Sequence, residues 1–191
     1  DVDDTLLTGD ATASYSFNDT LRVYGRYARS FRAPSVQGRI VFGDAVTVAD
    51  TETIDSVEIG LRTRWLGGRA VFNVTGFWFR TDDQQLTAVG GAGNFNQLLN
   101  ADHVDGHGVE LDARVRLLGD LELTAGYSYN HTEIDSPGLE VGVCAASVPC
   151  TVRAPLDPVT GNALIDGNSL PQAPRHIANA AARYALPLRN W

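Results

Sequence analysis

Strict alternation of apolar and polar residues is the feature that most limits how this chain can fold. Val109–Leu117 alternates at every position, and Leu121–Tyr129 does the same. Val57–Trp65 also alternates, with Thr63 as its one ambiguous residue. A helix would scatter the charges of these segments around its circumference, whereas a strand gathers them on one face. The pattern therefore predicts amphipathic β-strands and an all-β fold.

The predicted strands are joined by connections that alternate between short and long. The expected strands are residues 9–17, 20–30, 55–66, 69–81, 105–117, 121–132 and 174–186. Tight turns are expected at 18–19, 67–68 and 118–120, and long loops at 31–54, 82–104 and 133–173. Because the chain reverses at each connection, every long loop emerges at the same end of an antiparallel, up-and-down sheet. Outer-membrane barrels have this arrangement, with short periplasmic turns and long extracellular loops.

Alternation alone does not decide whether the apolar face meets lipid or a packed protein core. The expected strands are mostly 9–13 residues long, whereas strands of soluble sheets usually have about 5–6 residues. The apolar face ends in aromatic residues such as Trp65, Trp78, Tyr127 and Tyr129, which suits the interfacial girdles of a membrane barrel. The opposite face carries charges such as Arg62 and Arg114 in its middle. These features favour a transmembrane barrel in contact with outer-membrane lipid over a soluble all-β domain.

Composition excludes several other classes of protein. The formal net charge of -8 argues against a nucleic-acid partner, because phosphate binding needs clustered cations. No motif for nucleotide binding or nucleophilic catalysis is found, so neither an enzyme nor a cofactor is expected. His103 and His107 would lie about 13 Å apart on a strand, and Glu110 would point to the opposite face, so no metal site is expected. Cys144 and Cys150 suit a loop disulfide in an oxidising compartment, with free thiols as the alternative.

Short sequence motifs resemble those of TonB-dependent receptors, in family order and at family spacing. Tyr24–Ser35 resembles the family's Y-x-x-Y-x-x-x-F-R-A-P-S stretch, and Glu52–Gly60 resembles its E-x-x-x-x-x-E-x-G strand. Three further matches follow along the chain: Phe77-Trp-Phe79 with Gln84-Gln85-Leu86, Asn100-Ala101 with Gly108-Val-Glu-Leu111, and Leu170-Pro-Gln-Ala-Pro-Arg-His176. Each match is weak alone, and five in order are a specific signal.

The resemblance implies that residues 1–191 are one partial barrel domain, from the carboxy-terminal part of the receptor's barrel. We expect about seven strands of a barrel of the 22-stranded size, with the plug domain and the final strands absent. The family location is the bacterial outer membrane. The implied function is import of a scarce nutrient, such as a ferric siderophore, with energy from the TonB–ExbB–ExbD complex acting through the plug. The ligand is then a small molecule or metal chelate.

Two groups of candidate site residues follow from this interpretation. The first group faces the lumen, where its members either pair with plug residues or pair only with one another and water: Arg22, Arg26, Glu58, Arg62, Arg64, Glu110, Asp112, Arg114 and Arg116. The second group is expected to contact ligand from the long loops, which carry recognition on a rigid scaffold: Arg80, Gln84, Gln85, Phe95, Asn96, Asn100 and His103.

Two alternatives to active transport stay open at the level of sequence. A passive, porin-like barrel would use the lumen charges for selectivity and would need no plug. A soluble all-β binding domain would instead pack Trp78, Leu111 and Val115 inside a core.

Overall fold

The structure, a computed structural model, describes residues 5–38, 45–90, 95–117, 121–142 and 152–186. Cys144 and Cys150, the predicted disulfide pair, lie outside the described residues. Within the described ranges, no helix is long and apolar enough to cross a membrane.

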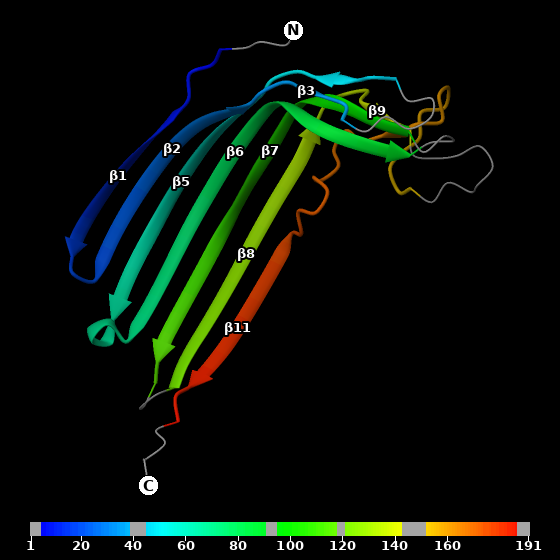
Figure 1. Ribbon diagram of the computed structural model, residues 1–191. Coiled ribbons are helices and arrows are strands. Elements are labelled where there is room, and N and C mark those ends of the chain that lie inside the picture. Colours follow the sequence, from blue (N-terminus) through cyan, green and yellow to red (C-terminus); the bar gives the residue numbers. More distant parts are fainter. Residues whose placement is uncertain (1–4, 39–44, 91–94, 118–120, 143–151, 187–191) are drawn as a thin grey trace.

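A single antiparallel sheet of seven long strands makes up most of the molecule (Figure 1). Its strands follow one another in chain order, so that each long strand pairs with the next long strand along the chain. The long strands are β1 (Gly9–Asn18), β2 (Leu21–Arg32), β5 (Glu52–Trp65), β6 (Ala70–Gly90), β7 (Phe95–Arg116), β8 (Leu121–Asp135) and β11 (His176–Tyr184). Two short pairs lie in the loops: β3 (Ser35–Val36) with β4 (Val48–Ala49), and β9 (Glu140–Val141) with β10 (Ala163–Leu164). The predicted up-and-down order of seven strands is confirmed.

The β1–β2 and β5–β6 turns lie at one end of the sheet, as predicted, whereas the turn predicted at 118–120 lies outside the described residues. Asn18 Oδ1 accepts hydrogen bonds from the backbone N–H and the hydroxyl of Thr20, at 2.9 and 2.7 Å, which fixes the β1–β2 turn. The β5–β6 turn is the single-turn 3-10 helix η1 (Leu66–Gly68). Leu66, Gly67 and Gly68 all have positive φ there, and the two glycines adopt this conformation without steric cost.

The prediction of a long loop at 82–104 is wrong. β6 continues to Gly90 and β7 begins at Phe95, and the two strands pair from Gln84↔Ala101 to Gly90↔Phe95. This extension bends aside from the sheet at its loop end (Figure 1). Asp83, with a positive φ of 54°, lies at a gap in the pairing. The extension contacts Ala33 and Asp50 of the loop between β2 and β5. Its sequence lacks the alternation that revealed the other strands.

The strand register gives the sheet one apolar and one charged face, because directly paired residues lie on the same face. One row on the apolar face consists of Val23, Leu61, Val74, Leu111 and Tyr127. The neighbouring row on the charged face consists of Arg22, Arg62, Asn73, Asp112 and Gly126. Ile59 and Trp65 on the apolar face are 70% and 58% exposed, so they do not belong to a packed protein core.

Aromatic residues mark both ends of the apolar face. Trp65 ends β5 at the turn end, whereas Trp78 pairs with Val57 eight residues further up β5. Eight residues span about 27 Å along a strand, or about 20 Å in height at the usual barrel tilt, which is close to the apolar band of about 25 Å. Beyond Trp78 the same face becomes charged, with Arg80 bonded to Asp105 and Arg29 to Asp55. The apolar face therefore has the height and borders of a membrane-facing band.

The small buried core lies at the loop end and on the charged face. Val104 and Ile134 are buried with Ala101, and Leu139, Ile165 and Leu170 pack against them. Val104 and Ile134 are paired in register with Thr81, and Thr81 is 1% exposed. Leu139, Ile165 and Leu170, from the described parts of the connection between β8 and β11, therefore cover the charged face at this end.

Three aromatic rings on the charged face lie against glycines of the next strand. The Tyr24 ring covers Gly60, while Phe77 and Phe79 cover Gly108 and Gly106. A Cβ atom at any of these glycines would overlap the ring. Because glycine has no side chain, each ring can lie flat against the backbone of the neighbouring strand.

We predict that Gly60→Ala destabilises the intact barrel by about 1–3 kcal/mol, the usual cost of overpacking. Gly25→Ala is the matched control, because the added Cβ would meet only the Glu58 backbone oxygen, at 3.8 Å. Urea unfolding of the two variants in detergent, followed by tryptophan fluorescence, measures the difference. Equal unfolding midpoints for both variants would show that the packing of the Tyr24 ring against Gly60 does not stabilise the barrel.

Candidate functional site

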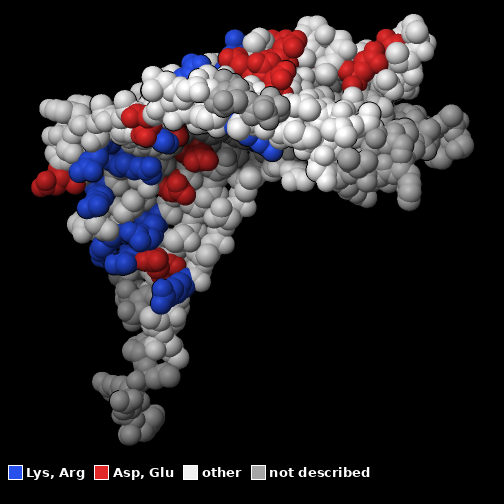
Figure 2. All heavy atoms as spheres, turned by 45° about the horizontal axis from the view of Figure 1, so that its top comes forward, with Lys and Arg blue, Asp and Glu red and all other residues white. Residues whose placement is uncertain are grey.

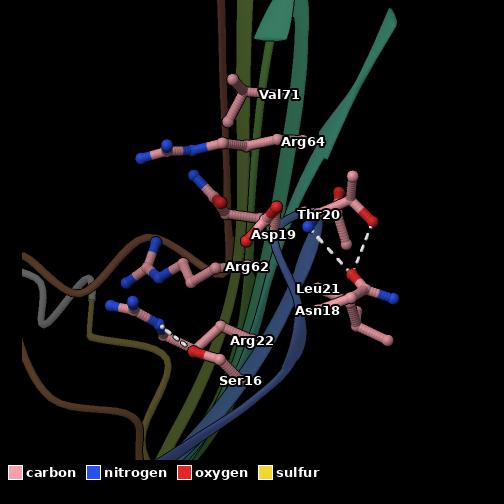
Figure 3. Close-up of a pocket in the computed structure, with 11 residues that line it drawn as sticks. Ser16, Asn18, Asp19, Thr20, Leu21, Arg22, Arg62, Arg64 and Val71 are labelled. Carbon is pink, nitrogen blue, oxygen red and sulfur yellow. Dashed lines mark hydrogen bonds between the residues drawn. The ribbon is translucent and has the colours of Figure 1, made fainter. Parts of the chain in front are cut away.

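A cavity at the turn end of the charged face is lined by Arg22, Arg62 and Arg64 (Figure 3). The cavity has a volume of about 740 Å³. The three side chains extend in the same direction from β2 and β5 (Figure 3). Arg22 Nε donates to Ser16 Oγ at 3.0 Å. The Arg62 guanidinium donates to the Tyr24 hydroxyl at 3.3 Å and lies 5.2 Å from the centre of its ring.

Ion pairs cross the charged face on either side of this cavity. Arg26 lies between two carboxylates, 3.5 Å from Asp10 and 3.7 Å from Glu58. Arg116 Nε donates to Glu122 at 2.8 Å. A second cavity, of about 340 Å³, is lined by Glu58, Glu110, Arg62 and the aromatic rings of Tyr24, Phe77 and Phe79. Arginines gather over the sheet, and carboxylates lie both among them and over the loops (Figure 2).

The predicted lumen residues all lie on the charged face. Their register places them in neighbouring rows of β2, β5 and β7: Arg22, Arg26, Glu58, Arg62, Arg64, Glu110, Asp112, Arg114 and Arg116. Some of their charges are neutralised within the sheet, as Arg26 and Arg116 show. Their pairing with a plug stays a prediction.

The residues predicted to contact ligand lie on strands, since the loop expected at 82–104 is largely the β6–β7 extension. Arg80 forms two hydrogen bonds with Asp105, at 3.0 and 2.6 Å, on the same face as Trp78. His103 Nδ1 is 2.8 Å from Asp82 Oδ1 on that face too. Asn96 is buried, and Phe95 is the first residue of β7. Strand geometry thus separates Arg80 and His103 from the charged face.

Gln84, Gln85 and Asn100 come together in a polar clamp that holds the preceding loop. The buried Gln85 amide donates to the backbone oxygens of Ala33 and Asp50, both at 2.9 Å, and its Oε1 accepts from the Ser35 hydroxyl. Asn100 bonds both the N–H and the carbonyl of Asp50, at 2.8 and 3.1 Å. The two described ends of the loop between β2 and β5 are therefore fixed to the β6–β7 extension.

Glu52 is the clamp residue that sequence reasoning missed. Its Oε2 accepts hydrogen bonds from the Gln84 amide and the Gln85 backbone N–H, both at 2.8 Å. Glu52 is the first residue of the E-x-x-x-x-x-E-x-G motif, so the available signal was its presence in that motif. The second glutamate of the motif, Glu58, lies on the same face of β5 six residues further along and is 3.7 Å from Arg26.

The loop hairpin of β9 and β10 is closed by carboxylates. Glu140 Oε2 accepts from the Thr160 hydroxyl at 2.7 Å and from the Asn162 amide at 3.1 Å. The backbone N–H groups of Thr160 and Val159 donate to Asp157 and lower the pKa of this carboxyl below its usual value. A lowered pKa stabilises the folded turn above the ordinary carboxyl pKa, and the contribution is lost as the pH falls through the lowered value. The hydrogen bonds to the Asp157 carboxylate therefore stabilise the turn at neutral pH.

His107 and Glu110 lie on opposite faces of β7, as the strand period requires. His107 pairs with Trp78 on the apolar side, whereas Glu110 pairs with Thr75 on the charged side. Among the described residues, no group of three or more histidine, cysteine, aspartate or glutamate side chains is placed to hold a metal ion.

Comparison with known proteins decides the family. The family model described as "TonB dependent receptor-like, beta-barrel" matches residues 1–191. The chain belongs to the TonB-dependent receptor family. Receptors of this family reside in the bacterial outer membrane and are transporters, not enzymes. The predicted location in the bacterial outer membrane is confirmed.

Solved structures show the same fold. The receptor sheet is similar to the ferric yersiniabactin uptake receptor FyuA of Yersinia pestis, with 20% identity, a TM-score of 0.66 and coverage of 94% of this chain and 23% of that one. It is also similar to the alcaligin outer-membrane receptor FauA of Bordetella pertussis, with 22% identity, a TM-score of 0.53 and coverage of 94% and 26%. The copper transporter OprC matches with 19% identity, a TM-score of 0.55 and coverage of 68% and 21%. The chain thus spans about a quarter of the length of these proteins.

We predict that Gln85→Leu loosens the loop between β2 and β5 without unfolding the sheet. The substitution removes the hydrogen bonds of the side-chain amide and leaves buried polar partners unsatisfied, at a cost of about 1–3 kcal/mol each. Limited proteolysis of the intact receptor in detergent should show faster cleavage between residues 33 and 50. Gln97→Leu, at an exposed position of the same hairpin, is the control. Equal cleavage of the two variants would rule out the clamp.

Proposed function

We propose that this sheet is part of the barrel of a receptor that imports a scarce nutrient, such as a ferric siderophore, with energy from the TonB–ExbB–ExbD complex. The observation that carries this proposal is the family match over the whole chain. The two-faced sheet supports it, since one face suits lipid and the other suits a polar bore. FyuA and FauA, two of the similar structures, are receptors for yersiniabactin and alcaligin.

The charged face would line a lumen that is occupied by a plug domain from elsewhere in the receptor. Glu58, Glu110 and Asp112 offer carboxylates, and the arginines beside them offer guanidiniums. A bore with charges of both signs can pair with a polar protein surface through charge-assisted hydrogen bonds. In this proposal the sheet performs no covalent chemistry and serves as wall and loop support.

The loop end would present the ligand contacts. Described parts of the β8–β11 connection cover the charged face, and the clamp holds the described ends of the β2–β5 loop beside the β6–β7 extension. Gln84, Gln85 and Asn100 would then act on the ligand through the loop that they hold, because their amides already bond to protein groups. Loops held on a rigid scaffold are where recognition commonly resides.

Uptake by cells that carry the intact receptor tests the proposed function. We expect accumulation of an iron-labelled siderophore, from a panel of chelates, to depend on both the receptor gene and TonB. The control is the same strain without the receptor. Uptake that continues at the same rate without TonB would contradict active import and would favour a passive, porin-like barrel.

A further inference from the structure

A groove on the apolar face lies beside Gly76, near the border where this face becomes charged. Gly76 pairs with Ile59 on one side and with Val109 on the other, and it has no side chain to fill the space between them. The groove has a volume of about 370 Å³, and Trp78 and Tyr129 complete its mainly apolar lining. Ile59, Trp78 and Val109 are all exposed, so the described part of the chain leaves the groove open.

Hydrogen-bond donors with basic side chains border the groove on its loop side. His107 lines the groove and pairs directly with His131 on the next strand, with the two ring centres 5.0 Å apart. Arg175, just before β11, donates to His131 Nδ1 at 3.3 Å. Among the described residues, no carboxylate forms an ion pair with Arg175. Its permanent charge is therefore available to an anion beside the two histidines.

Carboxylates follow in the next rows toward the loops, on the same face. A cavity of about 390 Å³ is lined there by the two histidines and by three carboxylates: Asp105, Glu133 and Asp135. Arg80 neutralises Asp105, and Glu133 Oε2 is 3.4 Å from His131 Nε2. Within the described residues, Asp135 forms no ion pair. This cavity therefore has an excess of negative charge.

We propose that the groove and the two rows beyond it form a lipid site, which holds one membrane lipid whose headgroup carries a phosphate followed by a primary ammonium group. The proposal rests on the proposed function, in which the apolar face meets the bilayer. One acyl chain would lie in the groove beside Gly76. The phosphate would accept charge-assisted hydrogen bonds from His107 and Arg175. The ammonium would donate to Glu133 and Asp135.

The order of the rows favours this headgroup over others. The register places Val109 with Tyr129, then His107 with His131, then Asp105 with Glu133. Successive rows are about 6.8 Å apart along a strand. Apolar, basic and acidic groups thus follow one another outward, as acyl chain, phosphate and ammonium do in such a lipid. A lipid with a phosphate alone would bring its negative charge close to the carboxylates, and this repulsion would weaken its binding.

Native mass spectrometry of the intact receptor tests the lipid site. The receptor is released from detergent micelles that contain equal amounts of phosphatidylethanolamine and phosphatidylglycerol with matched acyl chains. Phosphatidylglycerol has the phosphate but no ammonium group. We expect the wild type to retain phosphatidylethanolamine about fivefold more often, as for about two partly exposed ion pairs. In E133Q/D135N the two lipids should be retained equally.

Gly76→Val should abolish the preference, because its side chain would occupy the groove. The added Cβ atom would meet only Ile59 Cγ2, at 3.8 Å, so the backbone need not move. Gly25→Val is the matched control, because Gly25 also pairs with Ile59 on the apolar face but does not line the groove. This control should retain the lipids as the wild type does. Heat-modifiable migration on gels confirms that each variant forms a folded barrel.

Equal retention of the two lipids by the wild type would overturn the lipid site. A preference that survives in either folded variant, Gly76→Val or E133Q/D135N, would assign the selectivity to another part of the receptor and would also overturn it. Retention of neither lipid would have the same consequence. If the receptor in addition stayed folded and soluble without detergent, the proposed function would fail together with the lipid site.

Discussion

Backbone hydrogen bonding between neighbouring strands is the constraint on which the rest of this structure depends. Lipid offers no partner for a backbone N–H or carbonyl group, so a membrane-spanning strand must satisfy both within the sheet. The unbroken pairing of β2 with β5, and of β5 with β6, meets this requirement where these three strands face one another. Side chains are then free to differ completely between the two faces, since each strand has a period of two. Lipid contact on one face and charge on the other follow from this single arrangement.

The two ends of the sheet use polar groups differently. At the turn end, Arg22, Arg62 and Arg64 extend together and line the cavity on the charged face. At the loop end, the Gln85 amide donates to the backbone oxygen of Asp50, and Glu52 accepts from the Gln85 backbone N–H. These hydrogen bonds hold the end of the loop between β2 and β5. Val104 and Ile134 are covered by the connection from β8 to β11. The wall is therefore accessible near the turns and capped near the loops.

Sequence alone predicted the membrane-spanning strands well. A strand between lipid and water needs apolar side chains on one face and polar side chains on the other, and this requirement produces the alternation in the sequence. β5 and β8 were located within a few residues, and the shared face of Glu58 and Arg62 followed from the strand period. The β6–β7 extension was missed because its sequence lacks the alternation of the other strands; it contacts loop residues such as Ala33 and Asp50. The sequence predicted Gln85 as a ligand contact in an exposed loop. In the structure Gln85 is buried by contacts with Ala33 and Asp50, which are remote in sequence. No local pattern reports such a contact.

The central claim is that the odd-numbered residues of β7 between Val109 and Val115 face lipid and the even-numbered ones face the bore. A nitroxide scan tests it most directly, with Cys144 and Cys150 replaced by serine and one cysteine introduced at each position of 109–115 in the intact receptor. Collision with oxygen, which concentrates in the bilayer, should be highest at 109, 111, 113 and 115, with a strict period of two. Collision with a water-soluble nickel chelate should be low at the same positions. Oxygen maxima at the even positions, or no periodicity at all, would contradict the account.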